Sequence, residues 1–334
     1  YTGTPSNPGV GRDGRKLLKG HCWNFKRGGS IHMCFKECVA ELSSNQVFIT
    51  LPSKGRLFQP SVDLMTSAGL IHYFSNDRSY QACSRMKDLR IVFNRAADIP
   101  RIVEKGIVDL GITGRDLVKE SNANVEELLP LNYGYARLVL AAPASKFKDL
   151  NDLLRLGHIK VATEFPNITR SFFRGMNVDI EIISVEGTTE SMPNLGLSDC
   201  IVSVMSTGST LLLHGLKILA VIMESQAVLI GNRKSLENPE KQPVINYVKS
   251  TIGATQLAQE KKLLMMNVPE KCLKDVIGCL PCMSGPTISR VEAKEPMWEV
   301  ITVVDANKVF EVIYNVKEKG AKDILVLNID KVIL

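Results

Sequence analysis

Short apolar runs alternate with segments of helical spacing over most of the chain. Residues 46–51 form an apolar run rich in β-branched side chains, residues 52–56 are typical of a turn, and residues 57–69 carry apolar side chains at helical spacing. The same unit recurs, with strands predicted over 88–93, 108–112, 160–163 and 199–205 and helices over 98–105, 165–174 and 210–216. Buried strands that alternate with helices predict an α/β fold with a largely parallel sheet, covered on both faces.

The pattern changes near residue 257. Strands are predicted over 262–268, 287–292, 298–304 and 323–327, and helices over 270–280 and 307–319. Their order, βαββαβ, is that of the ferredoxin-like module. A small α+β domain is therefore expected after the large α/β body.

Residues 1–43 match neither part and are predicted to be a basic, poorly ordered leader. The first 40 residues contain seven glycines and no hydrophobic periodicity, and they carry seven Lys and Arg against two Asp and Glu. They thus hold five of the six net positive charges of the chain. The rest is almost neutral, so composition gives no support for a nucleic-acid-binding surface.

The leader also gathers histidines and cysteines: His21, Cys22, His32, Cys34 and Cys38. Their spacing matches no standard zinc finger, so we favour chance clustering over a metal site. The eight cysteines of the chain are too few for a disulfide scaffold, and residues 1–33 lack the apolar region of a secretory signal. No run reaches the roughly 18 apolar residues of a spanning helix. We expect a cytoplasmic protein without a membrane partner. The alternative is a plastid protein, whose leader would be the remnant of a transit peptide.

One predicted strand runs directly into a turn of hydroxyl and glycine residues that opens a helix. The turn consists of Ser206, Thr207, Gly208, Ser209 and Thr210. Backbone N–H groups, hydroxyls and the positive end of a helix together suit a phosphate group. The alternative is an ordinary helix N-cap, which favours the same residue types. The turn has no lysine of the Walker type, so a nucleoside-triphosphatase loop is not indicated.

Cations follow two other predicted strands. Lys54, Gly55 and Arg56 follow the first strand, and Arg115 follows the strand over residues 108–112. Each of these turns alone is typical of a solvated surface. Ligands of doubly wound sheets, however, bind beyond the carboxyl ends of parallel strands, which favours a shared anion site.

Two acidic residues are predicted near the phosphate turn. Glu190 and Asp199 can hold ribose hydroxyls or a magnesium ion, which prefers oxygen ligands. No Ser/His/Asp or Cys/His set is evident, so covalent nucleophilic catalysis is not expected.

Several stretches resemble, in the same order, the long form of ATP phosphoribosyltransferase, the family that begins histidine biosynthesis. They are residues 51–57, 109–116, 162–167, 196–211, 266–269, 285–289 and 320–330, together with Glu190. The resemblance covers about residues 46–334. It implies a two-lobed body of the periplasmic-binding-protein-like type (type II), with the active site in its cleft, and a ferredoxin-like regulatory domain.

The implied domain limits follow from that architecture. Lobe I, on the ATP side, takes residues 44–137 and 235–256, lobe II takes residues 138–234, and the regulatory domain takes residues 257–334. The implied reaction is Mg²⁺-dependent: N1 of ATP attacks the anomeric carbon of phosphoribosyl pyrophosphate (PRPP), giving phosphoribosyl-ATP and pyrophosphate. The resemblance also implies inhibition by L-histidine and a homo-oligomer, a dimer or hexamer.

The resemblance assigns roles to the candidate residues. Residues 206–210 would cradle the 5-phosphate of PRPP, and Glu190 and Asp199 would lie near the ribose as catalytic residues. ATP or pyrophosphate would face Lys54, Gly55, Arg56, Arg95 and Arg115. The effector region would include Thr287, Ser289 and Asp323. Magnesium would arrive with PRPP, and Glu190 is the candidate side chain to contact it.

One position departs from the family pattern. Ser203 stands where the family has an acid that helps to grip the ribose hydroxyls. Our hypothesis is that Glu190 and Asp199 suffice for activity. The alternatives are a catalytically impaired regulatory paralogue or a two-lobed small-molecule binding protein.

Overall fold

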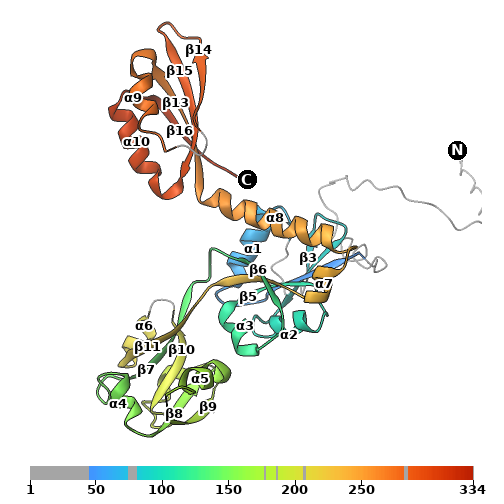
Figure 1. The fold of residues 1–334 in the computed structure, drawn as a ribbon, viewed down its shortest axis with the longest axis vertical. Coiled ribbons are helices and arrows are strands. Elements are labelled where there is room, and N and C mark those ends of the chain that lie inside the picture. Colours follow the sequence, from blue (N-terminus) through green and yellow to red (C-terminus); the bar gives the residue numbers. More distant parts are fainter. Residues whose placement is uncertain are drawn as a thin grey trace, which may run out of the picture. The chain divides into compact units, whose positions relative to one another are not determined.

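The computed structural model describes residues 45–73, 81–176, 178–185, 187–205, 208–281 and 285–333. The leader, with its histidines and cysteines, lies outside the described residues. Three sheets organise the described chain: one of seven strands in lobe I, one of five strands in lobe II and one of four strands in the C-terminal domain (Figure 1). Within this part of the chain, no helix combines the length and apolar character needed to cross a bilayer.

The lobe I sheet has the strand order β2-β3-β4-β1-β5-β12-β6. Its strands are β1 (Val47–Pro52), β2 (Ile71–Tyr73), β3 (Gln81–Ser84), β4 (Leu89–Asn94), β5 (Leu110–Gly114), β6 (Glu126–Pro130) and β12 (Ala227–Gly231). Its helices are α1 (Phe58–Ser67), α2 (Ile99–Glu104), α3 (Arg115–Ser121), α7 (Arg233–Glu237) and α8 (Gln242–Gln259).

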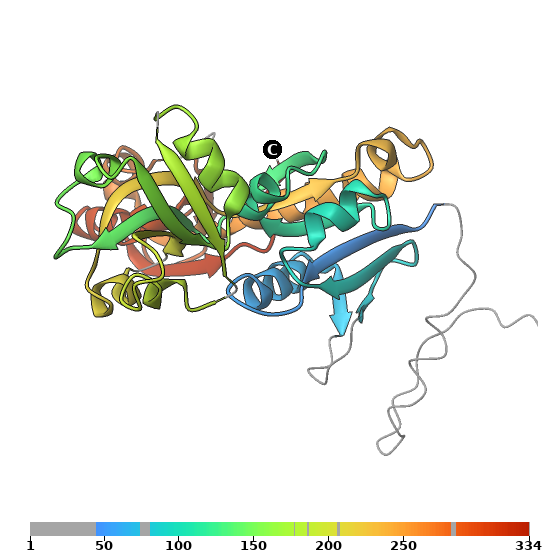
Figure 2. The same ribbon diagram turned by 90° about the horizontal axis from the view of Figure 1, so that it is seen from below.

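Alternation along the strands divides the lobe I core between two faces. On one face, Ile49 and Leu51 of β1 pack with α1 and α8; on the other, Phe48 packs with α2. Figure 2 shows the blue helix α1 and the teal helix α2 on opposite sides of β1. Both faces are therefore covered, as the sequence predicts.

The lobe II sheet has the order β11-β7-β10-β8-β9. Its strands are β7 (Ala136–Pro143), β8 (His158–Thr163), β9 (Asp179–Ser184), β10 (Cys200–Met205) and β11 (Leu216–Ser225). Its helices are α4 (Leu150–Leu154), α5 (Pro166–Phe173), the 3-10 turn η2 (Thr189–Ser191) and α6 (Ser209–Leu213). Helices α4 and α5 cover one face, while α6 packs on the other.

Both sheets are mixed, so the expectation of a largely parallel sheet is only half right. Parallel pairing is confined to β4-β1-β5 in lobe I and β10-β8-β9 in lobe II. Strands β12 and β7 pair antiparallel with β5 and β10, respectively. Hydrophobic runs show that these strands are buried but not in which direction they run, because both directions bury the same side chains.

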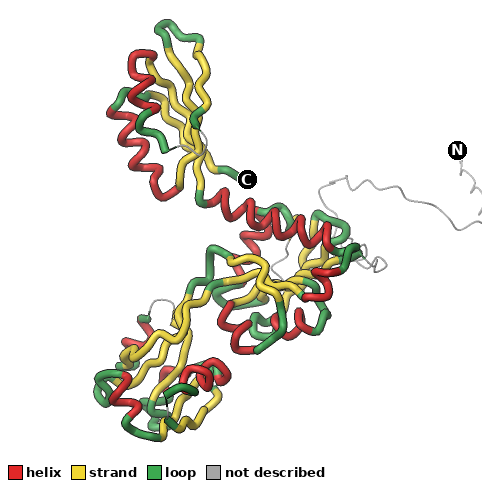
Figure 3. The backbone as a smooth tube through the Cα atoms, viewed as in Figure 1, coloured by secondary structure: helices red, strands yellow, loops and turns green. Residues whose placement is uncertain are grey.

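Two short connections join the lobes: residues 131–135 lead from β6 to β7, and Gln226 leads from β11 to β12 (Figure 3). The structure thus gives the expected two-lobed body. One limit needs correction, because β12 belongs to the lobe I sheet, whereas the sequence placed residues 227–231 in lobe II. Val228, Leu229 and Ile230 would suit the core of either sheet.

Buried Asp109 fixes the return of the chain to lobe I. Its carboxylate accepts from Phe48 N–H at 2.8 Å, from the Ser235 hydroxyl at 2.6 Å and from Lys241 Nζ at 2.7 Å. These partners come from β1, α7 and the N-cap of α8. Asp109, which belongs to one of the stretches that resemble the family, therefore connects the sheet to helices α7 and α8.

The C-terminal domain has the predicted βαββαβ order. Its strands are β13 (Lys261–Pro269), β14 (Thr287–Val291), β15 (Met297–Asp305) and β16 (Lys322–Asn328), and its helices are α9 (Leu273–Ile277) and α10 (Val309–Glu318), each preceded by a 3-10 turn, η3 (Glu270–Cys272) and η4 (Ala306–Lys308). The sheet order β14-β15-β13-β16 is antiparallel throughout. The ferredoxin-like prediction is confirmed.

Candidate functional site

The carboxyl ends of β1, β4 and β5 form one edge of lobe I. Turn hydrogen bonds hold this edge together: Ser53 N–H donates to Asn94 O at 2.8 Å, and the Thr113 hydroxyl donates to Ala96 O at 2.7 Å. The turn after β1, Arg95 after β4 and Arg115 after β5 all belong to this edge. The sequence prediction that separate cationic turns share one sheet edge is therefore correct.

Lys54, Gly55 and Arg95 are exposed at this edge. Within the described residues, neither Lys54 nor Arg95 forms an ion pair. Gly55 has a φ of +81°, and a Cβ added there would meet no atom within 4 Å. The turn thus leaves two cations and an open backbone available to an anionic ligand.

Arg56 is already engaged. Its Nη2 lies 3.1 Å from Asp116 Oδ2, and its Nη1 donates to the carbonyl of Gly134 in the first inter-lobe connection. Asp116 is buried and accepts from the Ser225 hydroxyl at 2.8 Å, next to the second connection. Arg56 therefore joins the candidate site to both connections between the lobes.

Arg115 is paired as well. It donates through Nε to Glu127 Oε2 at 3.1 Å and through Nη2 to the other carboxylate oxygen. The hydrogen bond to Glu127 raises the pKa of Arg115. Sequence reasoning left Arg115 free to reach an anion or to pair with Asp116; the structure pairs it with Glu127 of β6 and gives Asp116 to Arg56.

Lobe II presents a second edge, at the carboxyl ends of its parallel strands. Glu190 lies in η2, and the Ser203 hydroxyl of β10 donates to its Oε1 at 3.4 Å. Ser203, which departs from the family pattern, thus lies against the predicted catalytic acid. The residue that lies beside the Glu190 carboxylate is therefore Ser203.

Gly208 begins the helix that follows β10. It adopts a φ of +82°, and a Cβ there would come within 3.0 Å of Met205 Sδ, so only glycine fits without strain. Ser209 and Thr210 form the exposed first turn of α6. Ser206 and Thr207 lie outside the described residues. The described half of the hydroxyl-rich turn therefore follows the same strand that carries Ser203.

Asp199 is not part of this edge. It precedes β10, whereas Gly208 and the neighbours of Glu190 lie beyond or near its far end. Ser203, which contacts Glu190, lies four residues along the strand from Asp199, a separation of roughly 13 Å at about 3.3 Å per residue. The Asp199 carboxylate instead accepts from Lys160 N–H at 2.8 Å and so anchors the start of β8. This placement at the start of β10 argues against the role near the ribose that the resemblance implies for Asp199.

The three effector candidates do not meet within one chain. Thr287 and Ser289 are exposed on β14, and Asp323 lies in β16, where it accepts from Asn267 Nδ2 at 3.0 Å. Strands β14 and β16 are the two outer strands of the C-terminal sheet. Two strands separate them, so one chain alone does not form a compact site from these residues.

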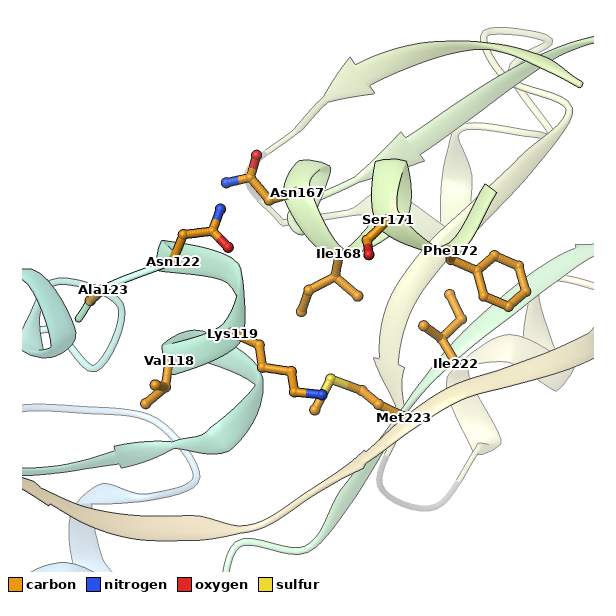
Figure 4. A pocket seen from close by; sticks show the side chains of 10 residues that line it. All are labelled: Val118, Lys119, Asn122, Ala123, Asn167, Ile168, Ser171, Phe172, Ile222 and Met223. Carbon is orange, nitrogen blue, oxygen red and sulfur yellow. The ribbon is translucent and has the colours of Figure 1, made fainter. Parts of the chain in front are cut away.

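A cavity of about 640 Å³ lies between α3, α5 and β11 (Figure 4). Its lining includes Lys119 of α3, Asn167 of α5 and Met223 of β11. None of the residues predicted to bind substrate lines it. Across the described residues, no group of three or more His, Cys, Asp or Glu is arranged to hold a metal ion.

Known proteins match this chain over both of its parts. A family model described as ATP phosphoribosyltransferase matches residues 95–252, and one described as HisG, C-terminal domain, matches residues 258–331. ATP phosphoribosyltransferases from Ignicoccus hospitalis and Methanosarcina mazei are 43% and 42% identical over 283 and 290 residues. Each alignment covers 85% of this chain and 98% of the relative.

A solved structure agrees with these matches. It is described as the ATP phosphoribosyl transferase (HisG:HisZ) complex from Thermotoga maritima, and the matching chain is 26% identical with a TM-score of 0.54. The match covers 62% of this chain and 99% of that chain. By sequence over nearly the whole length of its relatives, and by its added C-terminal domain, this chain belongs to the long form of the ATP phosphoribosyltransferase family.

Proposed function

We propose that this chain transfers the phosphoribosyl group of PRPP to N1 of ATP, releasing pyrophosphate. The observation that carries the proposal is the match to ATP phosphoribosyltransferases over 98% of their length. The two sheet edges support it, since one offers cations and the other offers a glycine–hydroxyl helix start beside a carboxylate.

Each edge has a part in the proposed reaction. Gly208, Ser209 and Thr210 bind the 5-phosphate through backbone N–H groups and hydroxyls, which holds the ribose over Glu190. Lys54 and Arg95 bind the phosphates of ATP and the pyrophosphate, and Arg56 is oriented toward the same edge by Asp116. Holding both substrates together contributes to the rate gain, because the reaction becomes effectively unimolecular.

The chemical step needs no protein nucleophile. The N1 lone pair forms the new bond to the anomeric carbon, the bond from that carbon to the pyrophosphate oxygen breaks, and its electron pair leaves with pyrophosphate. Positive charge develops on the ribose, where the Glu190 carboxylate stabilises it, and negative charge develops on pyrophosphate, where Lys54 and Arg95 stabilise it.

Magnesium fits this site in part. The Glu190 carboxylate and the Ser203 hydroxyl are hard oxygen donors, of the kind magnesium prefers. Two protein donors suit an ion that keeps most of its ligands from water and substrate phosphates. When bound, the ion neutralises charge on the leaving pyrophosphate.

The test is turnover by the purified chain with ATP, PRPP and magnesium. We expect phosphoribosyl-ATP and pyrophosphate in equal amounts. A small-molecule binding protein would bind a substrate and consume neither, and a regulatory paralogue would show no turnover without a partner chain.

The variant Ser203→Asp decides between a competent enzyme and an impaired paralogue. Since Asp199 is remote, we now propose that Glu190 and Ser203 alone form the ribose site. We expect Ser203→Asp to change kcat by less than about tenfold. A rise of several orders of magnitude from a near-zero rate would identify an impaired paralogue instead.

Regulation is proposed to follow the family as well. Histidine would inhibit without competing with PRPP, through residues 257–334, in a homo-oligomer. Thr287 and Asp323 lie on opposite outer strands, and both are proposed to contribute to binding of histidine. Changing either residue should therefore abolish inhibition at histidine concentrations that saturate the wild type. Thr287→Val and Asp323→Asn, assayed separately, test this.

A further inference from the structure

One contact between the lobes involves none of the residues predicted to bind substrate and neither connecting segment. It joins the last turn of α3 in lobe I to the first turn of α5 in lobe II. The backbone N–H groups of Asn167 and Ile168 donate to Glu120 Oε1 and Oε2 at 2.9 and 3.0 Å. In return, the Asn167 side-chain amide donates to the Glu120 carbonyl at 2.8 Å.

This contact supplies the N-terminal cap that α5 lacks locally. Phe165 stands at the N-cap and offers no side-chain acceptor, and Pro166, the first helical residue, has no N–H. The first free N–H groups are therefore those of Asn167 and Ile168, and both are satisfied by one carboxylate from the other lobe. The negative charge also lies at the positive end of α5. Each helix end thus satisfies polar groups of the other.

Both helices begin at a candidate substrate edge. Helix α3 starts with Arg115 and Asp116, and Asp116 holds Arg56. Helix α5 starts two residues after Glu164, which accepts from Gly187 N–H at 2.6 Å, close to the turn that carries Glu190. A link between α3 and α5 therefore bears on the spacing between the cations of lobe I and the carboxylate of lobe II.

Beside the contact, the two helices share only a limited apolar contact, in which Leu117 of α3 packs against the lobe II core cluster that contains Ile168 of α5. Figure 4 shows a cavity next to this contact, with Lys119 of α3 and the C-cap residue Asn122 on one side and Ser171 and Phe172 of α5 on the other. A cavity has no contacts to replace those of Glu120 if they are lost. Among the described residues, the hydrogen bonds that link α3 to α5 therefore all depend on Glu120.

We infer that Glu120 is a positioning residue, which sets the separation of the two substrate edges by capping α5 from the opposite lobe. The inference rests on the proposed function, because both edges must hold substrate for the separation to affect the rate. Glu120 touches no substrate. Loss of the Glu120 carboxylate therefore weakens the binding of both substrates more than it slows the chemical step.

The test compares Glu120→Ala and Glu120→Gln with a matched control. Glu104→Ala is the control, since Glu104 also accepts a backbone N–H, from Asn124 at 2.7 Å, but within lobe I. We expect Glu120→Ala to raise KM for both ATP and PRPP about tenfold, equivalent to about 1.4 kcal/mol, with kcat within about twofold. Glu120→Gln keeps one acceptor oxygen and should fall between wild type and Glu120→Ala. Unchanged KM values, or the same rise in Glu104→Ala, would overturn the inference.

A second readout is independent of catalysis. Dyes attached through unnatural amino acids at exposed positions 105 in lobe I and 155 in lobe II report the distance between the lobes by single-molecule energy transfer. We expect Glu120→Ala to broaden this distribution, and Glu104→Ala to leave it as in the wild type. An unchanged distribution in Glu120→Ala would contradict the inference. Absence of turnover in the wild type would contradict only the proposed function, because the distance measurement would still decide the role of Glu120.

Discussion

The guanidinium of Arg56 is held from two sides, by the Asp116 carboxylate and by the Gly134 carbonyl. Asp116 is 1% exposed, so its charge would be costly to bury without Arg56 and the Ser225 hydroxyl. The sequence pattern indicated a cation at Arg56 but not this partner, because Asp116 is 60 residues away. Residue types near a strand end therefore predict which charges a site contains, but not which of its side chains form ion pairs with one another.

Replacing Asp116 tests that pairing. Asp116→Asn keeps a partner for Ser225 but removes the charge opposite Arg56. Because about a third of the Arg56 side chain is exposed, solvent reduces the effect, and we expect a loss of about 1–2 kcal/mol in the free energy of unfolding. KM for ATP should rise as well, since Arg56 loses its orientation. Urea denaturation and steady-state kinetics measure the two effects.

The control for this prediction is Glu127→Gln, which removes the charge opposite Arg115 from a more exposed pair. We expect that variant to cost well under about 1 kcal/mol. Equal losses in both variants would show that burial of Asp116 does not decide the effect.

At the level of elements, pattern and pairing contribute separately. The apolar runs predicted β1, β5, β8 and β10 and the helices after them, because buried strands and amphipathic helices have distinct periods. They did not predict that β12 returns to lobe I, since strand pairing depends on contacts distant in sequence. Asp199 is a different case: the predicted strand began at Asp199 and ended at the phosphate turn, and the role of Asp199 near the ribose came from the family resemblance and not from the pattern.

A cross-strand cluster in lobe II gives a prediction about pH. His158 Nδ1 of β8 lies 2.6 Å from Asp179 Oδ2 of β9, and Nε2 lies 3.6 Å from Glu181 Oε2. The hydrogen bond to Asp179 raises the pKa of His158 above its ordinary value of 6.5. A raised folded-state pKa contributes stability that is fully present below that ordinary value and lost as pH rises through the folded pKa.

We therefore expect His158→Gln to lower the urea midpoint more at about pH 6 than at about pH 9. The pair is exposed, so the difference should be small. A double-mutant cycle with Asp179→Asn isolates the pair. A loss from His158→Gln that is equal at both pH values would rule out the charged histidine as its cause.

At the level of the whole molecule, the sequence predicted the division into a leader, an α/β body and a ferredoxin-like domain. The lobe structure of the body came from the family resemblance, because periodicity alone does not reveal where a chain crosses between two sheets. The spacing of the lobes depends on Glu120 and Asn167, 47 residues apart, which no local pattern indicated.

Removing either terminal part should preserve turnover, but only removal of the C-terminal domain should abolish inhibition by histidine. Without residues 1–40, turnover should be unchanged, because none of the candidate site residues lies there; a large loss of turnover would indicate a role for the His and Cys cluster of the leader.

Without residues 257–334, turnover should persist and inhibition by histidine should disappear. Initial rates with and without histidine, compared with the full chain, measure both. Undiminished inhibition in the second variant would place the effector site elsewhere.

The lobe II edge is the proposed binding site of the PRPP phosphate, and calorimetric titration of PRPP with magnesium tests this assignment directly. Thr210→Val removes one hydroxyl donor without changing the shape of the side chain. Loss of a hydrogen bond to a charged group is worth about 1.5–3 kcal/mol, so we expect at least about tenfold weaker binding of PRPP. Thr66→Val, at an exposed position of α1, is the control and should bind PRPP like the wild type. Wild-type affinity for PRPP in Thr210→Val would contradict the account.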